Sequence, residues 1–353
     1  MNPSKVRLPA CVLECRSLLE SYADALSRPE LFSSISSGPS PDQRLLRVTA
    51  FFLSQLKCMR PVKCVSKPYN PVLGEYFICS WPEPQFGDVY FIAEQTSHHP
   101  PVSSFHAVCP KTNTSLTSTL HTKSGIITSK IPPFLKAMTV DYKGQTVISL
   151  GNHDEVYTMT YPTAVATGIL SYSPRLVLSG NVTISCSSNL GRVDLTFAEE
   201  SLVHGTVYCT QSGAQVASIG GDWRKLVELC YENGCKKVNR SEEEDAMKEE
   251  VRSKRENGRK SVLLDMRDWS EPSDGKRVPS IARQGDLESR RLWRLLTRSL
   301  AGYTTELDAD TAKTSVEKWA RSRGTEESSL QFFDVDPDNP LEVKFKFLPE
   351  LCD

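Results

Sequence analysis

The chain begins with a stretch in which hydrophobic residues recur every three or four positions, the spacing of one helix face. This face comprises Leu18, Leu19, Tyr22, Ala25 and Leu26. Ser17 and Glu20 fit a capping box at its start, in which each side chain accepts a hydrogen bond from a free backbone N–H of the first turn. We therefore expect a short amphipathic helix that ends near Arg28.

A longer helix is predicted to follow. Ser40-Pro41-Asp42-Gln43 forms a second capping box, with proline at the first helical position, where its missing N–H costs nothing. The apolar face of this helix consists of Leu45, Leu46, Val48, Phe52, Leu53 and Leu56. Such a face is typical of a helix that packs on a protein core.

Between about Asp88 and Leu229 the pattern changes to short β-branched and aromatic runs separated by Gly, Asn, Asp and Pro. Examples are DVYFIAE, TVISL, VYTMTY, RLVLSGNVTISC and RVDLTF. Several of these runs alternate between apolar and polar residues, which predicts strands with two unlike faces. So many consecutive strands favour an antiparallel barrel or sandwich, because closure removes exposed sheet edges.

The last part of the chain changes character again. Residues 236–260 are almost entirely charged and have no apolar stripe, so we expect a solvated excursion rather than a binding tail. The stretches ESRRLWRLLTRSL and DADTAKTSVEKWARSR then predict further helices. Since no internal repeat or second-domain linker is visible, we expect a single domain.

Composition narrows the classes of function. The chain has 353 residues, of which 39% are hydrophobic, enough for a sizeable core. Lys and Arg number 42 against 43 Asp and Glu, so the overall charge does not favour a nucleic-acid partner. The eleven cysteines include no CxxC pair and are read as reduced, cytosolic thiols. No apolar run reaches the roughly 18 residues of a membrane-spanning helix, so any membrane contact should be peripheral.

The segment EQTSHHPP contains two of the six histidines, His98 and His99, followed by two prolines. Proline favours an extended residue before it and cannot donate to a sheet ladder, so the strand from Val89 should end at the histidines. Two imidazoles at the rim of a sheet suit a phosphate dianion. The alternative is one buried and one solvent-facing histidine.

Catalysis and metal binding are less well supported by this segment. Ser97 and Ser103 do not occur in a GxSxG nucleophile elbow. Neighbouring residues on a strand point to opposite faces and chelate poorly, and no HExxH or Cys-His cluster completes a zinc site. We therefore expect no enzyme activity, no metal and no cofactor.

A second segment, KPYNPVLGE at residues 67–75, presents an amine, an amide and a carboxylate on a turn restricted by two prolines. Together with EQTSHHPP it resembles the signature segments of the oxysterol-binding-protein-related lipid-transfer family. LPACVLECRSLLESYADALSRPELF is similar to the family's N-terminal lid, GGDW to the end of its barrel, and LESRRLWRLLTRSL to its C-terminal helical segment. The resemblance covers nearly the whole chain.

This resemblance implies a mainly β (α+β) fold: a large, nearly closed antiparallel β-barrel with a lipid tunnel, an N-terminal helical lid and a C-terminal helical subdomain. Within a single domain, 1–353, we expect a lid region at 1–40 and a helix with the first signature turn at 41–87. The main barrel is expected at 88–230, a charged connection at 231–285 and the helical subdomain at 286–353. The lid residues would be Leu8, Leu18, Leu19, Tyr22 and Leu26.

The resemblance also implies a site for the headgroup of phosphatidylinositol 4-phosphate. Residues that match the family's pattern are Lys67, Asn70, Glu75, His98, His99, Lys313, Glu317 and Arg321. The last three are spaced four apart, which puts them on one helix face, although an exposed salt-bridge ladder is the alternative. The cations would neutralise the phosphate, while Asn70 and Glu75 suit hydroxyls or positioning of the lysines.

The second lipid is expected to be phosphatidylserine, because VLECRSLLESYADAL resembles the lid of family members associated with that lipid. Sterol is the alternative, since Cys15 replaces an expected proline and Ala320 a usual glutamine. A lipid-sensing scaffold with little transfer is a further alternative. The resemblance implies a cytoplasmic protein, peripheral at membrane contact sites.

Residues 331–336, QFFDVD, are similar to an acidic two-phenylalanine motif that docks on an endoplasmic-reticulum receptor. The motif here lacks a leading acidic residue and is followed by Pro337. Packed aromatic core is therefore the favoured reading of this segment.

Overall fold

The computed structural model describes residues 13–58, 67–128, 135–167, 175–188, 191–198, 201–231, 260–269, 275–302, 308–323 and 330–347. Leu8 and the charged stretch as far as residue 259 lie outside these ranges. Among the helices described, none combines the length and apolar character needed to cross a membrane.

The described residues form a large antiparallel sheet of thirteen strands, in the order β15-β14-β13-β12-β11-β10-β8-β7-β6-β5-β4-β3, with β9 paired to β7 and β10. The strands are β3 (Tyr76–Trp81), β4 (Val89–His98), β5 (Pro101–Cys109), β6 (Thr114–Thr128), β7 (Leu135–Leu150), β8 (Glu155–Met159), β9 (Thr163–Thr167), β10 (Arg175–Cys186), β11 (Arg192–Phe197), β12 (Leu202–Tyr208), β13 (Gln215–Asp222), β14 (Leu226–Tyr231) and β15 (Lys260–Asp265).

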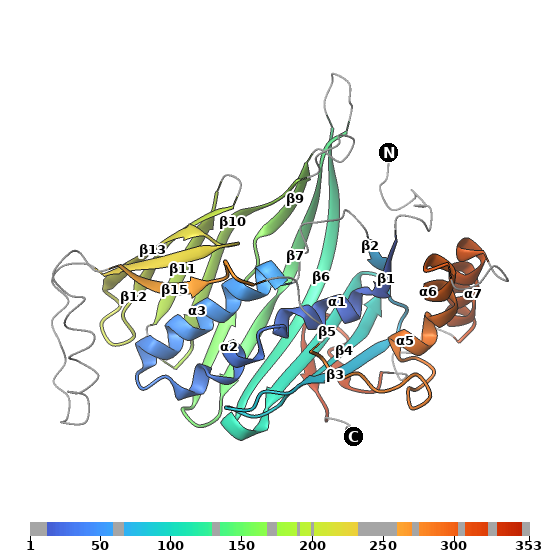
Figure 1. The fold of residues 1–353 in the computed structure, drawn as a ribbon, viewed down its shortest axis with the longest axis horizontal. Coiled ribbons are helices and arrows are strands. Elements are labelled where there is room, and N and C mark those ends of the chain that lie inside the picture. Colours follow the sequence, from blue (N-terminus) through green and yellow to red (C-terminus); the bar gives the residue numbers. More distant parts are fainter. Residues whose placement is uncertain are drawn as a thin grey trace.

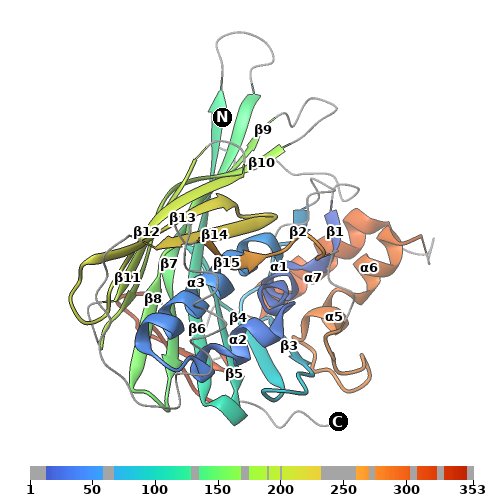
Figure 2. The same cartoon turned by 60° about the vertical axis from the view of Figure 1, so that its left-hand side comes forward.

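The sheet curls around the N-terminal helices, which lie against its inner face (Figure 1). Figure 2 shows the same fold from another direction, in which the strands bend around these helices from two sides. The enclosed elements are α1 (Leu18–Ala23), α2 (Pro29–Ser33) and α3 (Pro41–Cys58), with short 3₁₀ turns η3 (Asp24–Leu26) and η4 (Ile35–Ser37). One apolar cluster joins side chains of these helices to inward-facing residues of the strands.

The first helix differs from its prediction. It ends at Ala23, continues as the 3₁₀ turn η3, and a separate helix α2 starts at Pro29. Ser17 accepts from the backbone N–H of Leu19 at 3.4 Å, so the N-cap is present. Glu20 instead pairs with side chains far along the chain, which a local capping signal cannot reveal. The predicted apolar face is nonetheless buried at Leu19, Tyr22 and Leu26, and Leu18 is half-buried.

Helix α3 begins where its capping signal predicts. Its first residue is Pro41, and the hydroxyl of Ser40 accepts from the backbone N–H of Gln43 at 3.3 Å. Arg44 donates two hydrogen bonds of 2.7 Å to the carboxylate of Glu155 and so attaches the helix to β8. Every residue from 48 to 56 is buried, because the helix enters the space that the sheet encloses.

The outer face of β3 and β4 is covered by the C-terminal segment, which contains β16 (Phe333–Val335) and β17 (Val343–Phe345). Phe332 and Phe333 are buried there beside Ile92. The carboxylate of Glu94 accepts hydrogen bonds from the backbone N–H groups of residues 331, 332 and 333, at 2.7, 3.0 and 3.2 Å. The aromatic pair of the 331–336 segment is therefore packed core, as the favoured reading expected.

The remaining elements lie beside the start of the sheet. β1 (Leu13–Ser17) pairs in parallel with β2 (Lys67–Tyr69), next to α5 (Ser289–Leu292), α6 (Arg294–Leu300) and α7 (Ala309–Ser322). A short 3₁₀ turn, η5 (Pro110–Thr112), connects β5 and β6. The predicted fold class is confirmed, with a large antiparallel sheet, enclosed N-terminal helices and a C-terminal helical part. The sheet is wider than residues 88–230, since β3 precedes that range and β15 follows it.

Candidate functional site

The two signature segments lie side by side in the structure. The backbone N–H of Gly74 donates to the carbonyl of Gln95 at 3.0 Å, and the N–H of Gln95 donates to the carbonyl of Glu75 at 2.8 Å. Gly74 has φ of 73°, a left-handed conformation that glycine adopts without strain. This turn leads directly into the β3–β4 pairing, so KPYNPVLGE and EQTSHHPP occupy one corner of the sheet.

Glu75 lies beneath this corner rather than on its surface. Its carboxylate is fully buried and accepts from the Ser289 hydroxyl at 2.7 Å, the Trp293 indole N–H at 2.9 Å and the Val72 backbone N–H at 3.1 Å. The hydroxyl of Ser17 donates to the same carboxylate. Burial raises the pKa of Glu75, and these hydrogen bonds oppose the rise. Glu75 therefore connects the lid strand β1, the signature turn and the C-terminal helices.

His98 and His99 lie at the exposed end of β4. The strand stops at His98, which is paired with Pro101 across a tight hairpin, as the prolines predict. Both imidazoles are exposed, and their ring centres are 4.7 Å apart. The alternative in which one histidine is buried is therefore wrong.

Helix α7 carries the third group of predicted residues. Its apolar side packs on α6 through Ala312, Val316 and Ala320, which leaves the neighbouring side for charged residues. The carboxylate of Glu317 lies 3.9 Å from the Lys313 ammonium and 3.5 Å from the Arg321 guanidinium. The three side chains share one helix face, as their spacing predicts, and they form the salt-bridge ladder that was the alternative to a headgroup role, with one carboxylate between two cations.

Electrostatic interactions connect these three groups in space. The pKa of Lys67 is lowered by partial burial of its ammonium and by the charge of Lys313. The pKa of His98 is lowered by partial desolvation of its otherwise exposed ring, then by the charges of His99 and Arg321, while the charge of Glu317 acts in the opposite direction. We call Lys67, His98, His99, Lys313 and Arg321 the basic cluster. Its members come from residues up to 254 positions apart in the sequence, and Asn70 lies exposed on the turn after Lys67.

The basic cluster has the chemistry of an anion site. Burial, and after it repulsion from neighbouring basic groups, lowers the pKa values of Lys67 and His98, so an anion that binds beside them would relieve part of an existing electrostatic cost. Lysine, arginine and protonated histidine all donate charge-assisted hydrogen bonds to phosphate oxygens. Within the part of the chain that the structure describes, no group of three or more His, Cys, Asp or Glu could hold a metal ion.

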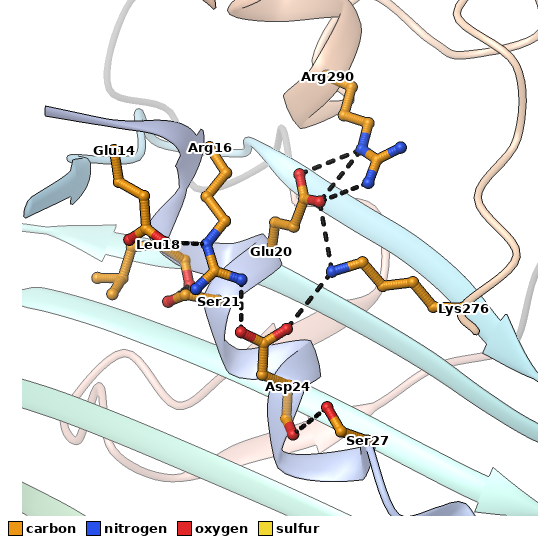
Figure 3. A network of polar contacts seen from close by, with 9 residues as sticks. All are labelled: Glu14, Arg16, Leu18, Glu20, Ser21, Asp24, Ser27, Lys276 and Arg290. Carbon is orange, nitrogen blue, oxygen red and sulfur yellow. Dashed lines mark hydrogen bonds and ion pairs between the residues drawn. The ribbon is translucent and has the colours of Figure 1, made fainter. Parts of the chain in front are cut away.

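A second charged group holds the lid helix α1 and was not predicted from the sequence. Arg290 donates to Glu20 at 2.6 Å, and Lys276 lies 3.4 Å from both Glu20 and Asp24 (Figure 3). Arg16 pairs with Asp24 on the same side of the helix. We call Arg16, Glu20, Asp24, Lys276 and Arg290 the lid network.

Every carboxylate in the lid network is paired. Burial alone would raise the pKa of Glu20, but the hydrogen bond and charge of Arg290, with Lys276 and Arg16, outweigh it and lower the pKa. The available sequence signal was a pair of acidic residues four apart on an otherwise apolar helix. Arg16 lies eight residues from Asp24, but Lys276 and Arg290 lie more than 250 residues away, so no local pattern could identify these two partners.

The chain was compared with known proteins. The family model described as Oxysterol-binding protein matches residues 1–306. Oxysterol-binding protein-related protein 11 of Homo sapiens is 30% identical over 340 residues, covering 85% of this chain and 41% of that protein. Oxysterol-binding protein-related protein 5 of Homo sapiens is 31% identical over 363 residues, covering 96% and 36%. The chain thus spans less than half the length of these relatives.

Solved structures have the same fold. The Osh1 ORD domain in complex with cholesterol aligns with a TM-score of 0.69 at 22% identity, covering 96% of this chain and 81% of that one. The Osh3 ORD in complex with PI(4)P from Saccharomyces cerevisiae aligns with a TM-score of 0.67 at 15% identity, covering 99% and 87%. The family match across most of the chain and the shared fold lead to one conclusion: this chain belongs to the oxysterol-binding protein family.

Proposed function

We propose that this domain binds phosphatidylinositol 4-phosphate at the basic cluster and exchanges it for a second lipid between membranes. The observation that carries the proposal is the convergence of Lys67, His98, His99, Lys313 and Arg321 at one exposed corner of the sheet. Among the residues that the structure describes, Glu317 is the one ion-pair partner of this cluster, so its described part holds more positive than negative groups. A phosphate monoester supplies negative charge.

Each residue has a role that follows from its position. The cations of the basic cluster bind the phosphate oxygens, with the planar guanidinium of Arg321 able to make two parallel hydrogen bonds. Glu317 holds Lys313 and Arg321 apart and orients them. Asn70 suits an inositol hydroxyl or a glycerol oxygen. Glu75 acts as a positioning residue, since its carboxylate is occupied by four protein donors.

The lipid's hydrocarbon needs an apolar environment of its own. Exposing acyl chain to water costs about 0.8 kcal/mol per CH₂, on the order of 12 kcal/mol for one sixteen-carbon chain. We place the lipid's hydrocarbon between the sheet and helices α1–α3, whose apolar side chains form one cluster, and the proposed lid comprises α1 and its flanking residues. Opening the lid requires the lid network to separate, which links lipid entry to those ion pairs.

Phosphatidylserine is the favoured second lipid. The resemblance of residues 12–26 to the lids of members associated with this lipid supports it, and its phosphate suits the basic cluster. Sterol is the alternative, and one of the solved structures similar in fold contains cholesterol. Both cargoes would compete with the phosphoinositide for one space, so a phosphoinositide gradient could drive transport of the second lipid.

Extraction of labelled phosphatidylinositol 4-phosphate from liposomes tests the headgroup site. The double variant His98→Ala/His99→Ala should lose at least about tenfold in extraction, because charge-assisted hydrogen bonds contribute roughly 1.5–3 kcal/mol each. The matched control is His204→Ala, another exposed histidine, on β12. Extraction at the wild-type level by the double variant would refute the assignment of the site.

A transfer assay separates the proposed carrier from a lipid-sensing scaffold. Donor liposomes carry phosphatidylserine and acceptor liposomes carry phosphatidylinositol 4-phosphate. A carrier moves both lipids in opposite directions, catalytically with respect to protein. Capture without transfer beyond one lipid per protein would favour the scaffold.

A further inference from the structure

Gln55 is a polar side chain without a partner in the interior of the fold. It lies in the fully buried half of α3 and is only 1% exposed. Neither its amide oxygen nor its amide nitrogen has a hydrogen-bond partner among the described residues. The other buried polar residues of this half are satisfied locally, since Thr49 donates to the carbonyl of Leu45 at 2.9 Å and Ser54 to that of Phe51 at 2.7 Å.

An unpaired amide at this position destabilises the fold. A buried donor or acceptor without a partner loses its hydration and gains nothing in return, whereas a leucine of similar volume would fit the apolar cluster. Native interiors contain few such groups, and each requires a physical reason. A ligand that carries its own hydrogen-bonding group into this interior is such a reason.

The ring contacts of Phe51 and Phe52 indicate where in the interior Gln55 lies. Phe51, one turn earlier, packs on Phe32 of α2, with ring centres 5.2 Å apart. Phe52 packs on Tyr161, which follows β8, at 5.8 Å. Residues three and four apart share a helix face, so Gln55 lies one turn beyond both contacts, between the lid side and the sheet side.

The charge of the interior restricts the chemistry of the ligand group. On the sheet side, the Tyr161 hydroxyl lies 2.7 Å from that of Thr146, which donates to Ser118 at 2.7 Å, so this chain of hydroxyls is neutral. The buried Arg44 is neutralised by its two hydrogen bonds to Glu155. A neutral polar group is therefore favoured next to Gln55 over a charged one.

We propose that Gln55 is a specificity-determining residue for the body of the bound lipid, where its carboxamide hydrogen-bonds a neutral oxygen within an otherwise apolar molecule. The amide can donate to an ester carbonyl or accept from a hydroxyl, so a glycerolipid ester and a sterol hydroxyl share the required chemistry. This inference rests on the proposed lipid-binding function. It adds a contact on a different element, α3, that is independent of the charge of the basic cluster.

Matched pairs of lipids test this contact. Wild type, Gln55→Leu and the control Ser54→Ala are compared for extraction from phosphatidylcholine vesicles that contain cholesterol or 5α-cholestane, which lacks the hydroxyl. A second pair of vesicles contains phosphatidylserine with ester-linked chains or with ether-linked chains, and the ether form lacks the two ester carbonyls. Gln55→Leu should reduce capture of the oxygen-bearing member about three- to tenfold and leave its matched partner unchanged.

The lipid pair in which Gln55→Leu reduces capture shows whether the oxygen belongs to a sterol hydroxyl or to an ester carbonyl. Without lipid, Gln55→Leu should raise the melting temperature by about 2 °C or more, because it removes an unpaired polar group, whereas Ser54→Ala should not. If Gln55→Leu captures each of the four lipids as well as wild type does, the inference is overturned and the proposed function is left intact. A lower melting temperature for Gln55→Leu would also overturn it. Failure of the wild type to capture any of the lipids would overturn both proposals.

Discussion

The basic cluster and the lid network are both built from charged side chains, yet they differ in how the charges are balanced. In the lid network, Glu20 and Asp24 are buried and each meets at least two cations. In the basic cluster, the carboxylate of Glu317 lies between Lys313 and Arg321, and His98, His99 and Arg321 are exposed. The first arrangement lowers the pKa of a carboxylate, and the second lowers the pKa values of a lysine and a histidine.

This contrast separates structural charge from charge available for binding. A buried and fully paired group stabilises the position of an element, and removing one partner leaves the others unbalanced. A surface group of like charges is held together at a cost, and that cost is recovered when a ligand of opposite charge binds. Mutations in the two groups should therefore affect different measurements.

The largest effect is expected from Glu20→Ala. This change leaves Lys276 and Arg290 without one of their carboxylates and should reduce the free energy of unfolding by about 3 kcal/mol, as for other broken buried pairs. Chemical denaturation measures the loss, and hydrogen exchange of residues 18–26 should accelerate. Glu30→Ala is the control, because Glu30 forms a half-buried pair with Arg28 alone, where Glu20 meets two cations, and should cost less than about 1 kcal/mol. Equal effects of the two changes would contradict the comparison.

A binding defect without a stability defect is expected from Lys67→Met. Removing the ammonium deletes one phosphate contact and also relieves the repulsion from Lys313. Affinity for phosphatidylinositol 4-phosphate should fall about tenfold or more, while the melting temperature stays constant or rises. Lys318→Met on α7 removes an exposed charge outside the cluster and should leave affinity within about twofold. A clear drop in melting temperature for Lys67→Met would show that this lysine stabilises the fold, as the charges of the lid network do, and would contradict its assignment to the basic cluster.

A smaller effect is expected from pH. The pKa of His98 lies below its ordinary value in the free protein, and a bound phosphate dianion would raise it, so binding takes up a proton. Affinity should be highest below the pKa of His98 in the free protein, decline by up to about tenfold per unit as pH rises from that value to the pKa of the bound state, and level off above it. Titration calorimetry between pH 6.5 and 8 measures this slope. The slope should vanish in His98→Ala/His99→Ala, and its persistence there would contradict the assignment.

Much of the local structure could be predicted from the sequence. The start of α3 at Pro41, the end of β4 at the histidines and the ladder of Lys313, Glu317 and Arg321 all depend on residues within a few positions of one another. Capping, the restricted backbone of proline and side-chain periodicity act over this range. The two signature segments were likewise recognisable as linear motifs.

Other features depend on contacts that no local pattern contains. Glu20 was assigned to a capping box, but the tertiary structure supplies Lys276 and Arg290, whose charges compete for the same carboxylate. Glu75 was predicted to contact a headgroup, whereas Ser289 and Trp293 enclose its carboxylate. The unpaired state of Gln55 also becomes visible only once the surroundings of α3 are known.

The sequence by itself determined the family, the mainly β class and the residues suited to binding phosphate, because composition, periodicity and motifs are properties of short segments. Only the tertiary structure decided which of these residues meet. Lys67 and Lys313 interact although 246 positions separate them, because β2 and α7 pack in the same corner of the molecule. Convergence of this kind is set by how the sheet curls and the helices pack, and no single stretch of sequence specifies it.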